Sequence, residues 1–220
     1  MAPVTEVAFL PLRPGVDIND TSTSEGKVMA NMVEVGKHAP GVQKNYWGIE
    51  EENSAHVHLM LDWDSLEAHK AYQARPEYPE FLAAARSMVN PESTSEAFHV
   101  SFTPHPPTPA LQAPVTEILR AYYPVDQVST EGVAFEADLL RLLDALRAHG
   151  VPGFSGEISS GWSLEEVDYE STPSKVFVAY IGWDSVQAHV DATKSEIYQA
   201  NRLNRLPKAI KVAHVKVKSP

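Results

Sequence analysis

Glu6 and His69 are the residues of this sequence whose types and surroundings best suit proton transfer. Leu66, His69 and either Tyr72 or Gln73 follow helical spacing, so the His69 imidazole is expected to point toward apolar surroundings. A lowered pKa there would keep it neutral and able to exchange a proton near pH 7. The structural alternative is a buried histidine that hydrogen-bonds a carbonyl and holds its helix in place.

Glu6 lies in an apolar run typical of a strand, where a carboxylate that is buried enough could act as a general base. An outward, solvated glutamate is the alternative, because the faces of this strand are not fixed by the sequence. Tyr72 and Tyr78 carry phenols that could hydrogen-bond a substrate carbonyl or enolate and stabilise its charge. They could also be amphipathic side chains at the edge of a core. The predicted catalytic residues are His69, Glu6, Tyr72 and Tyr78.

A second group of residues is predicted to contact substrate rather than to react with it. Its members are Trp63, His58, Glu117, Trp183, His189 and Tyr198. His56 and His58 alternate along one strand face like a pair of metal ligands, but no third ligand is evident near them, so no metal site is predicted. His99 and His214 are expected to complete hydrogen-bonded strand edges.

Four of these candidates belong to a stretch that occurs twice, as Trp63-Asp64-Ser65-Leu66-Glu67-Ala68-His69 and as Trp183-Asp184-Ser185-Val186-Gln187-Ala188-His189. Each copy follows a run of strand-forming residues and opens a helix. Asp64 with Glu67, and Asp184 with Gln187, are expected to cap these two helices. The repetition predicts a tandem duplication.

The rest of the chain fits two copies of one unit. In the first copy we expect strands at 4–10, 41–49, 56–63 and 96–102, and helices at 25–38, 64–74 and 78–88. This order is β-α-β-β-α-β, the ferredoxin-like unit. In the second copy we expect strands from 115, at 153–164, at 174–183 and around His214, and a helix at 133–149.

Between the copies, residues 104–114 contain five prolines, which predicts a stiff, extended linker. The predicted domains are therefore 1–103, 104–114 and 115–220. Each unit covers one sheet face with helices, and two units on one chain could bury their bare faces together. The predicted fold is α+β, with the two units forming an intramolecular barrel.

The amino-acid composition limits the classes of molecule that the protein is expected to bind. The net charge of −11 argues against nucleic acid and anionic membranes, and the lack of cysteine excludes thiolate chemistry. No apolar run approaches 18 residues, which favours a cytoplasmic protein. We expect a hydrophobic small-molecule substrate, no cofactor, and a monomeric pseudo-dimer, with a homodimer left open.

The unit, the glutamate in its first strand and the Trp-Asp-Ser opening resemble the dimeric α/β-barrel superfamily. They look closest to antibiotic-biosynthesis-monooxygenase-like (ABM) domains, which occur as tandem fusions in fungi. The resemblance implies a small-molecule pocket between each sheet and its helices. Related plant polyketide cyclases carry a catalytic histidine where Glu6 stands, and a tyrosine and a histidine where Tyr72 and Tyr78 stand. Anthrone oxygenases carry an asparagine where Leu59 and Ala179 stand, and the helix 78–88 lacks the axial histidine of haem-degrading members.

The function predicted first is acid–base catalysis without a cofactor, by a cyclase or isomerase acting on a polyketide-like or terpenoid-like intermediate. One alternative is a cofactor-free monooxygenase of phenols or anthrones, and another is a non-catalytic binding or stress-response protein. Because Ala192 replaces Tyr72 in the second copy, the first copy is predicted to hold the working site.

Overall fold

The protein is described by a computed structural model that covers residues 2–203 and 207–219. Its internal contacts divide the chain into two units. The first contains the residues up to His99 together with Lys218 and Ser219, and the second contains Val100–Val217. The boundary predicted after residue 103 falls four residues beyond this division.

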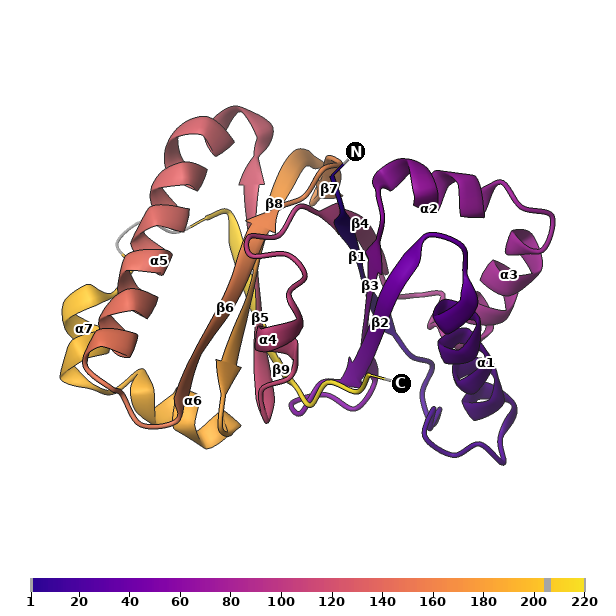
Figure 1. Cartoon of the computed structure of the whole chain (residues 1–220), viewed down its shortest axis with the longest axis horizontal. Coiled ribbons are helices and arrows are strands. Elements are labelled where there is room, and N and C mark those ends of the chain that lie inside the picture. Colours follow the sequence, from indigo (N-terminus) through magenta and orange to yellow (C-terminus); the bar gives the residue numbers. More distant parts are fainter. Residues whose placement is uncertain (1, 204–206, 220) are drawn as a thin grey trace. The chain divides into compact units, whose positions relative to one another are not determined.

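The first unit is a four-stranded antiparallel sheet in the order β2-β3-β1-β4. Helices α1, α2 and α3 all lie on one face of this sheet (Figure 1). The elements are β1 (Val4–Pro11), α1 (Ser24–His38), β2 (Val42–Ile49), β3 (His56–Trp63), α2 (Leu66–Gln73), α3 (Tyr78–Met88) and β4 (Glu96–Val100).

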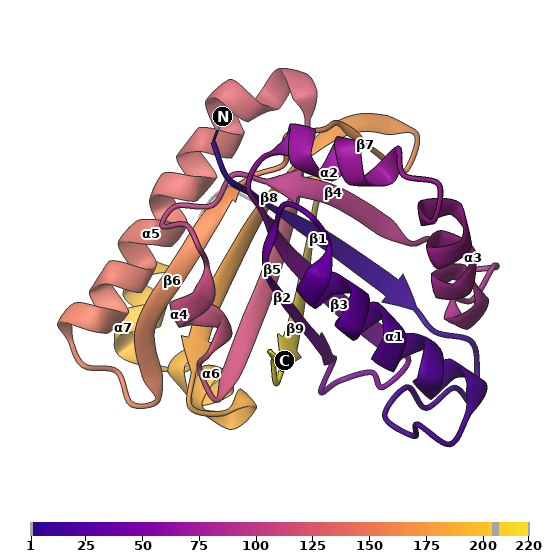
Figure 2. The same ribbon diagram turned by 45° about the vertical axis from the view of Figure 1, so that its right-hand side comes forward.

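The second unit repeats this plan with the order β6-β8-β5-β9, and the short strand β7 pairs with β8. Helix α5 runs along one face of this sheet (Figure 2). The elements are α4 (Thr108–Leu111), β5 (Val115–Pro124), α5 (Val133–Ala148), β6 (Phe154–Trp162), β7 (Val167–Tyr169), β8 (Thr172–Trp183), α6 (Val186–Ala192), α7 (Glu196–Asn201) and β9 (Ala209–Val215), with short helical turns at Val125–Gln127 and Val128–Gly132. The predicted α+β class with two ferredoxin-like units is confirmed.

The repeated stretch opens its helix in both units, but the predicted caps are wrong. The side chain of Ser65 accepts a hydrogen bond from the Ala68 amide, and Ser185 accepts one from the Ala188 amide. Each serine has extended backbone angles, so its hydroxyl reaches the third amide of the helix as an N-cap should. Asp64 instead accepts a hydrogen bond from the Gln43 side chain at 2.9 Å.

A glycine precedes the second strand of each unit because the helix of the repeated stretch comes very close there. Gly41 and Gly153 adopt φ values of +89° and +78°. A Cβ at these positions would lie 2.8 Å from the Ala68 Cβ and 2.4 Å from the Ala188 Cβ. The Pro-Gly pair that recurs in the sequence therefore marks a place where only glycine fits.

The predicted extended linker instead contains the one-turn helix α4. Pro109 occupies its first turn, where the missing N–H costs nothing. Ala110 and Leu111 are buried, and the Thr116 hydroxyl donates to the Ala110 carbonyl at 2.9 Å. Burial of Ala110 and Leu111 therefore stabilises a helical turn here, although the prolines of the segment favour an extended chain.

Lys218 belongs to the first unit although it follows the whole second unit in the sequence, and it pairs with the edge strand β2. The amides and carbonyls of Trp47 and Lys218 exchange two hydrogen bonds, at 2.9 and 2.7 Å. The Lys218 ammonium lies 4.2 Å from the centre of the Trp47 ring and donates to the Asn19 side chain at 2.7 Å. The contact covers part of an otherwise open sheet edge.

None of the helices in the described ranges has both the length and the apolar character needed to cross a membrane.

We predict that Ser65→Ala and Ser185→Ala each lower the free energy of unfolding by about 1 kcal/mol, since each removes an N-cap hydrogen bond. Urea unfolding followed by circular dichroism measures this. Asp64→Ala is the matched control and should change the free energy by less than about 0.5 kcal/mol. A larger loss for Asp64→Ala than for Ser65→Ala would contradict the assignment.

Candidate active site

A cavity of about 420 Å³ lies between the sheet and the helices of the first unit. Most of its wall is apolar, and a few polar groups interrupt it. The apolar lining includes Ala8, Leu10, Met29, Met32, Val33, Trp47, Leu59, Leu61, Phe81, Leu82 and Ala85; the polar or amphipathic lining includes Glu6, Asn45, Trp63, His69, Tyr72, Gln73, Tyr78, Arg86 and Ser95. A hollow of this character suits a mainly apolar small molecule.

Strand alternation explains which residues form the floor of the cavity. Glu6 pairs with Leu61, and Ala8 pairs with Leu59, so these side chains share the helix-covered face of the sheet. The face of Glu6, which the sequence left open, is thereby settled. The glutamate points toward the helices and not toward solvent.

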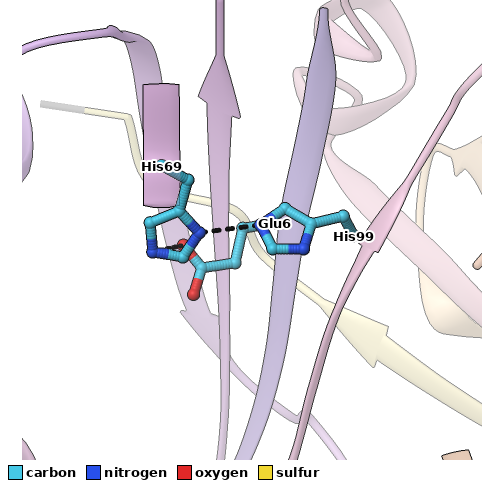
Figure 3. A group of neighbouring side chains, drawn as sticks. All are labelled: Glu6, His69 and His99. Carbon is cyan, nitrogen blue, oxygen red and sulfur yellow. Dashed lines mark hydrogen bonds and ion pairs between the residues drawn. The ribbon is translucent and has the colours of Figure 1, made fainter. Parts of the chain in front are cut away.

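Glu6, His69 and His99 form one connected group (Figure 3). The Nδ1 atom of His69 lies 2.7 Å from Nε2 of His99, and its Nε2 atom lies 3.5 Å from Oε2 of Glu6. Both histidines are buried, whereas the Glu6 side chain keeps 19% of its surface exposed. Glu6 and His69 both line the cavity, and the carboxylate is the more exposed of the two.

This arrangement can accept a proton and pass it inward. The short contact between the two imidazoles requires one ring to donate and the other to accept. A proton taken from a molecule in the cavity by Glu6 or His69 can therefore be shared with His99, and the carboxylate stabilises the imidazolium that forms.

The same three residues have the types of a metal site, and one ligand atom from each lies within 4.8 Å of the others. Two imidazole nitrogens on one tetrahedral zinc ion are separated by about 3.3 Å, given bonds of about 2.05 Å. The 2.7 Å contact of His69 with His99 is shorter than that and has the length of a hydrogen bond. The observed geometry fits proton sharing better than ligation.

Trp63 supports both partners of the pair. Its indole ring stacks on the His69 ring at 4.3 Å between centroids, and its Nε1–H donates to Oε2 of Glu6 at 3.1 Å. Trp63 thus fixes the carboxylate and the imidazole with one side chain while also lining the cavity.

Tyr72 and Tyr78 stand together on the helix side of the cavity, with ring centroids 5.7 Å apart in an edge-on arrangement. Burial raises the pKa of both phenols, and the charge of Glu6 adds to the rise for Tyr78. Both remain neutral hydrogen-bond donors at physiological pH. A phenol in this state can donate to a substrate oxygen that gains negative charge.

The second unit holds a copy of the whole group. His189 lies 2.7 Å from His214 and 3.5 Å from Glu117, and Trp183 donates to Glu117 at 2.8 Å. Here the carboxylate is buried, with 6% of its side-chain surface exposed. Burial raises the pKa of Glu117 to about 7, although the hydrogen bond from Trp183 and the charge of His214 act in the opposite direction.

The space beside this second group is occupied by packed side chains. A single apolar cluster covers the helix side of the sheet, and Ala192 in it stands where the first unit has Tyr72. Its buried members include Leu119, Phe135, Leu139, Leu142, Leu143, Leu146, Phe177, Ile181 and Trp183. Tyr198, the counterpart of Tyr78, packs against this cluster, and burial raises its pKa.

The sequence matches no protein-family model and has no significant relative among curated proteins. Solved structures do match over the full length. A candidate monooxygenase from Lactobacillus acidophilus NCFM covers 100% of this chain and 96% of its own, with a TM-score of 0.57 and 12% identity. An anthrone oxidase-like protein covers 100% of this chain and 94% of its own, with a TM-score of 0.61 and 15% identity.

The chain shares the fold of these proteins over its full length, with two ferredoxin-like units in tandem. A candidate chlorite dismutase gives a further match, with a TM-score of 0.59 and 14% identity over 98% of this chain and 95% of its own. The resemblance drawn from the repeated stretch is thereby confirmed for the fold. Identities this low carry the fold and leave the activity to be argued from the site.

Within this fold, the structure brings Glu6, His69, Tyr72, Tyr78 and Trp63 to one cavity, as their predicted roles require. His58 lies elsewhere. The alternation along β3 turns Leu59, Leu61 and Trp63 toward the cavity and His58 to the opposite face.

There His58 contacts Glu50 at 2.7 Å, and His56 contacts the other oxygen of Glu50 at 2.8 Å. Glu50 is thus a third polar group beside His56 and His58, and the sequence pattern did not reveal it.

The sequence analysis did not identify two residues of the site as functional. His99 was expected only to finish a strand edge, and Asn45 was not considered. The signal for His99 was its recurrence as His214, together with that of Glu6 and His69 as Glu117 and His189.

We predict that the stability of the protein falls as the pH rises through 7, because Glu117 has a folded-state pKa above its ordinary value of 4.5. Its protonated form is favoured by folding, so this contribution is complete below about pH 4.5 and is lost above about pH 7. The shift corresponds to about 3 kcal/mol. Urea unfolding midpoints between pH 5 and pH 8 measure it.

Glu117→Gln removes the titrating group and should flatten this pH dependence, whereas Glu6→Gln should leave most of it. An unchanged slope in Glu117→Gln would show that another group is responsible.

Proposed function

We propose that the first unit is a cofactor-independent oxygenase that acts on an apolar phenol-like or anthrone-like substrate. The observation that carries the proposal is the Glu6–His69–His99 group opening onto an apolar cavity of about 420 Å³. A substrate of this class has an acidic hydrogen, and a base beside an apolar hollow is what its activation needs.

The reaction begins when Glu6 or His69 removes a proton from the activated carbon. The resulting carbanion reduces molecular oxygen and forms a carbon–oxygen bond, and a proton returned from the relay completes a hydroperoxide. Loss of water, with removal of the second hydrogen from the same carbon, leaves a carbonyl group. One CH₂ group and one O₂ thus give one C=O group and one water, and the substrate supplies all the electrons.

The other cavity residues assist by binding and by excluding water. Tyr72 and Tyr78 are neutral donors placed to hold the substrate oxygen that carries the negative charge of the carbanion. The Trp63 ring and the leucines of the floor contact the flat apolar surface of the substrate.

The similar structures support an oxygenase over the cyclase or isomerase predicted first. Monooxygenase candidates and an anthrone oxidase-like protein are among the full-length matches. A cyclase or isomerase would use the same proton-transfer groups, and that assignment stays a prediction. The two reactions differ in their need for oxygen.

We predict that the protein consumes oxygen with anthrone as substrate, without added metal or flavin, and that Glu6→Gln and His69→Ala each reduce the rate by about 10²–10⁴-fold. An oxygen electrode measures the rate. The losses should fall on turnover, while circular dichroism shows an intact fold.

Glu117→Gln and His189→Ala are the matched controls, since they make the same changes beside the packed cluster of the second unit. They should leave the rate within about twofold. Equal losses in both units would assign the group a structural role. Product formation at the same rate under anaerobic conditions would reject the oxygenase proposal and favour a cyclase or isomerase.

A further inference from the structure

We infer that Asn45 selects substrates that carry a hydroxyl group, by accepting a hydrogen bond from that hydroxyl across the cavity floor from Glu6. The inference rests on the proposed function for the identity of the reacting position at Glu6. It adds a specificity-determining residue and a feature of the substrate.

The strand register places the two residues on either side of one leucine. Leu61 of β3 pairs with Glu6 of β1 on one side and with Asn45 of β2 on the other. Residues paired in this way share a sheet face, and adjacent strands are about 4.8 Å apart. The backbones at Asn45 and Glu6 are therefore separated by about 9.6 Å, with the Leu61 side chain between them.

Asn45 is buried, with 9% of its surface exposed, in a wall that is otherwise mostly apolar. The helix above makes room for it. A Cβ added to Gly36 would lie 2.4 Å from the Asn45 Nδ2 atom, so any larger residue there would displace the amide. The glycine of α1 therefore leaves room for a polar side chain, which is not required for apolar packing at this position.

The second unit shows what packing alone selects at this place. Ile158 pairs with Ile181, which in turn pairs with Glu117, so Ile158 holds the position of Asn45. It packs against the apolar cluster that occupies the helix side of that sheet. A carboxamide thus appears in the unit that has the cavity, and an isoleucine in the unit whose equivalent space is packed.

The orientation of the amide leaves its acceptor for a ligand. Nδ2 donates to the Val33 carbonyl at 2.9 Å, which fixes the side chain. Among residues 2–203 and 207–219, no donor hydrogen-bonds the Oδ1 atom of Asn45. This oxygen can accept a hydrogen bond from a hydroxyl group bound in the cavity that Asn45 lines.

The register limits the substrate. Asn45 and Glu6 project from β2 and β1 on the same sheet face, with β3 between them, so a ligand that reaches both must extend across Leu61. A ring compound with its hydroxyl group and its acidic position on different sides of the ring meets this requirement.

Equilibrium dialysis of 1-naphthol and naphthalene against the full chain at pH 7 tests this inference. The ratio of the two dissociation constants isolates the hydroxyl group. We predict that Asn45→Leu, which keeps the size of the side chain, lowers the preference for naphthol by about fivefold to tenfold. Gly36→Ala, which keeps the amide but displaces it, should lower the preference in the same direction.

Asn53→Leu makes the same substitution in an exposed loop and should leave the ratio unchanged. Glu6→Gln tests whether the hydroxyl binds at the carboxylate instead. The inference is overturned if Asn45→Leu and Gly36→Ala keep the wild-type ratio, if Glu6→Gln alone lowers it, or if the wild-type protein binds no 1-naphthol. Because the assay needs no turnover, a protein that passes it and consumes no oxygen would reject the proposed function and retain the role of Asn45.

Discussion

A carboxylate on the helix-covered face of a sheet is tolerated only if donors surround it, and this constraint organises both units of the protein. In each unit the indole N–H at the end of the third strand meets the carboxylate, and a histidine from the following helix stacks on that indole. A second histidine from the last strand completes the group. Four elements are therefore tied together by one buried polar cluster, which specifies how the helix sits on its sheet.

The two units show how the same cluster can serve different ends. Around Glu117 the helix α5 presents leucines that pack against the sheet, and the carboxyl group is closed in. Around Glu6 the helix α1 presents methionines, valine and a glycine, and space remains between the layers. The polar cluster supplies a proton-transfer group in either case. Whether a molecule can reach that group depends on the volume of the neighbouring side chains.

Much of the fold could be predicted from the sequence because duplication made each pattern appear twice. The third strand and the helix Tyr78–Met88 were predicted with the bounds that the structure shows. The caps were not, because Asp and Ser are both good N-cap residues and only the backbone angles decide between them. The one-turn helix at Thr108–Leu111 was missed because proline content masks a short buried apolar pair.

The site was predictable only where its residues lie close in sequence. His69 and Tyr72 share a helix face, so spacing was enough to group them. Asn45 shares a sheet face with Glu6 because both pair with Leu61, and that register follows from the whole sheet and not from any local pattern. His99 is 30 residues from His69, and its role becomes visible once β4 is placed beside β1.

The contact of Lys218 with Trp47 makes the first unit discontinuous along the chain. During translation the first unit is therefore made as two separate segments, and the second unit is synthesised between them. Trp47, which forms part of the cavity wall, gains its cover only after the second unit has been synthesised. A fragment cut at the proline-rich segment would therefore present this tryptophan and its strand edge to the solvent, and attempts to dissect the protein into halves should carry Lys218 along with the first.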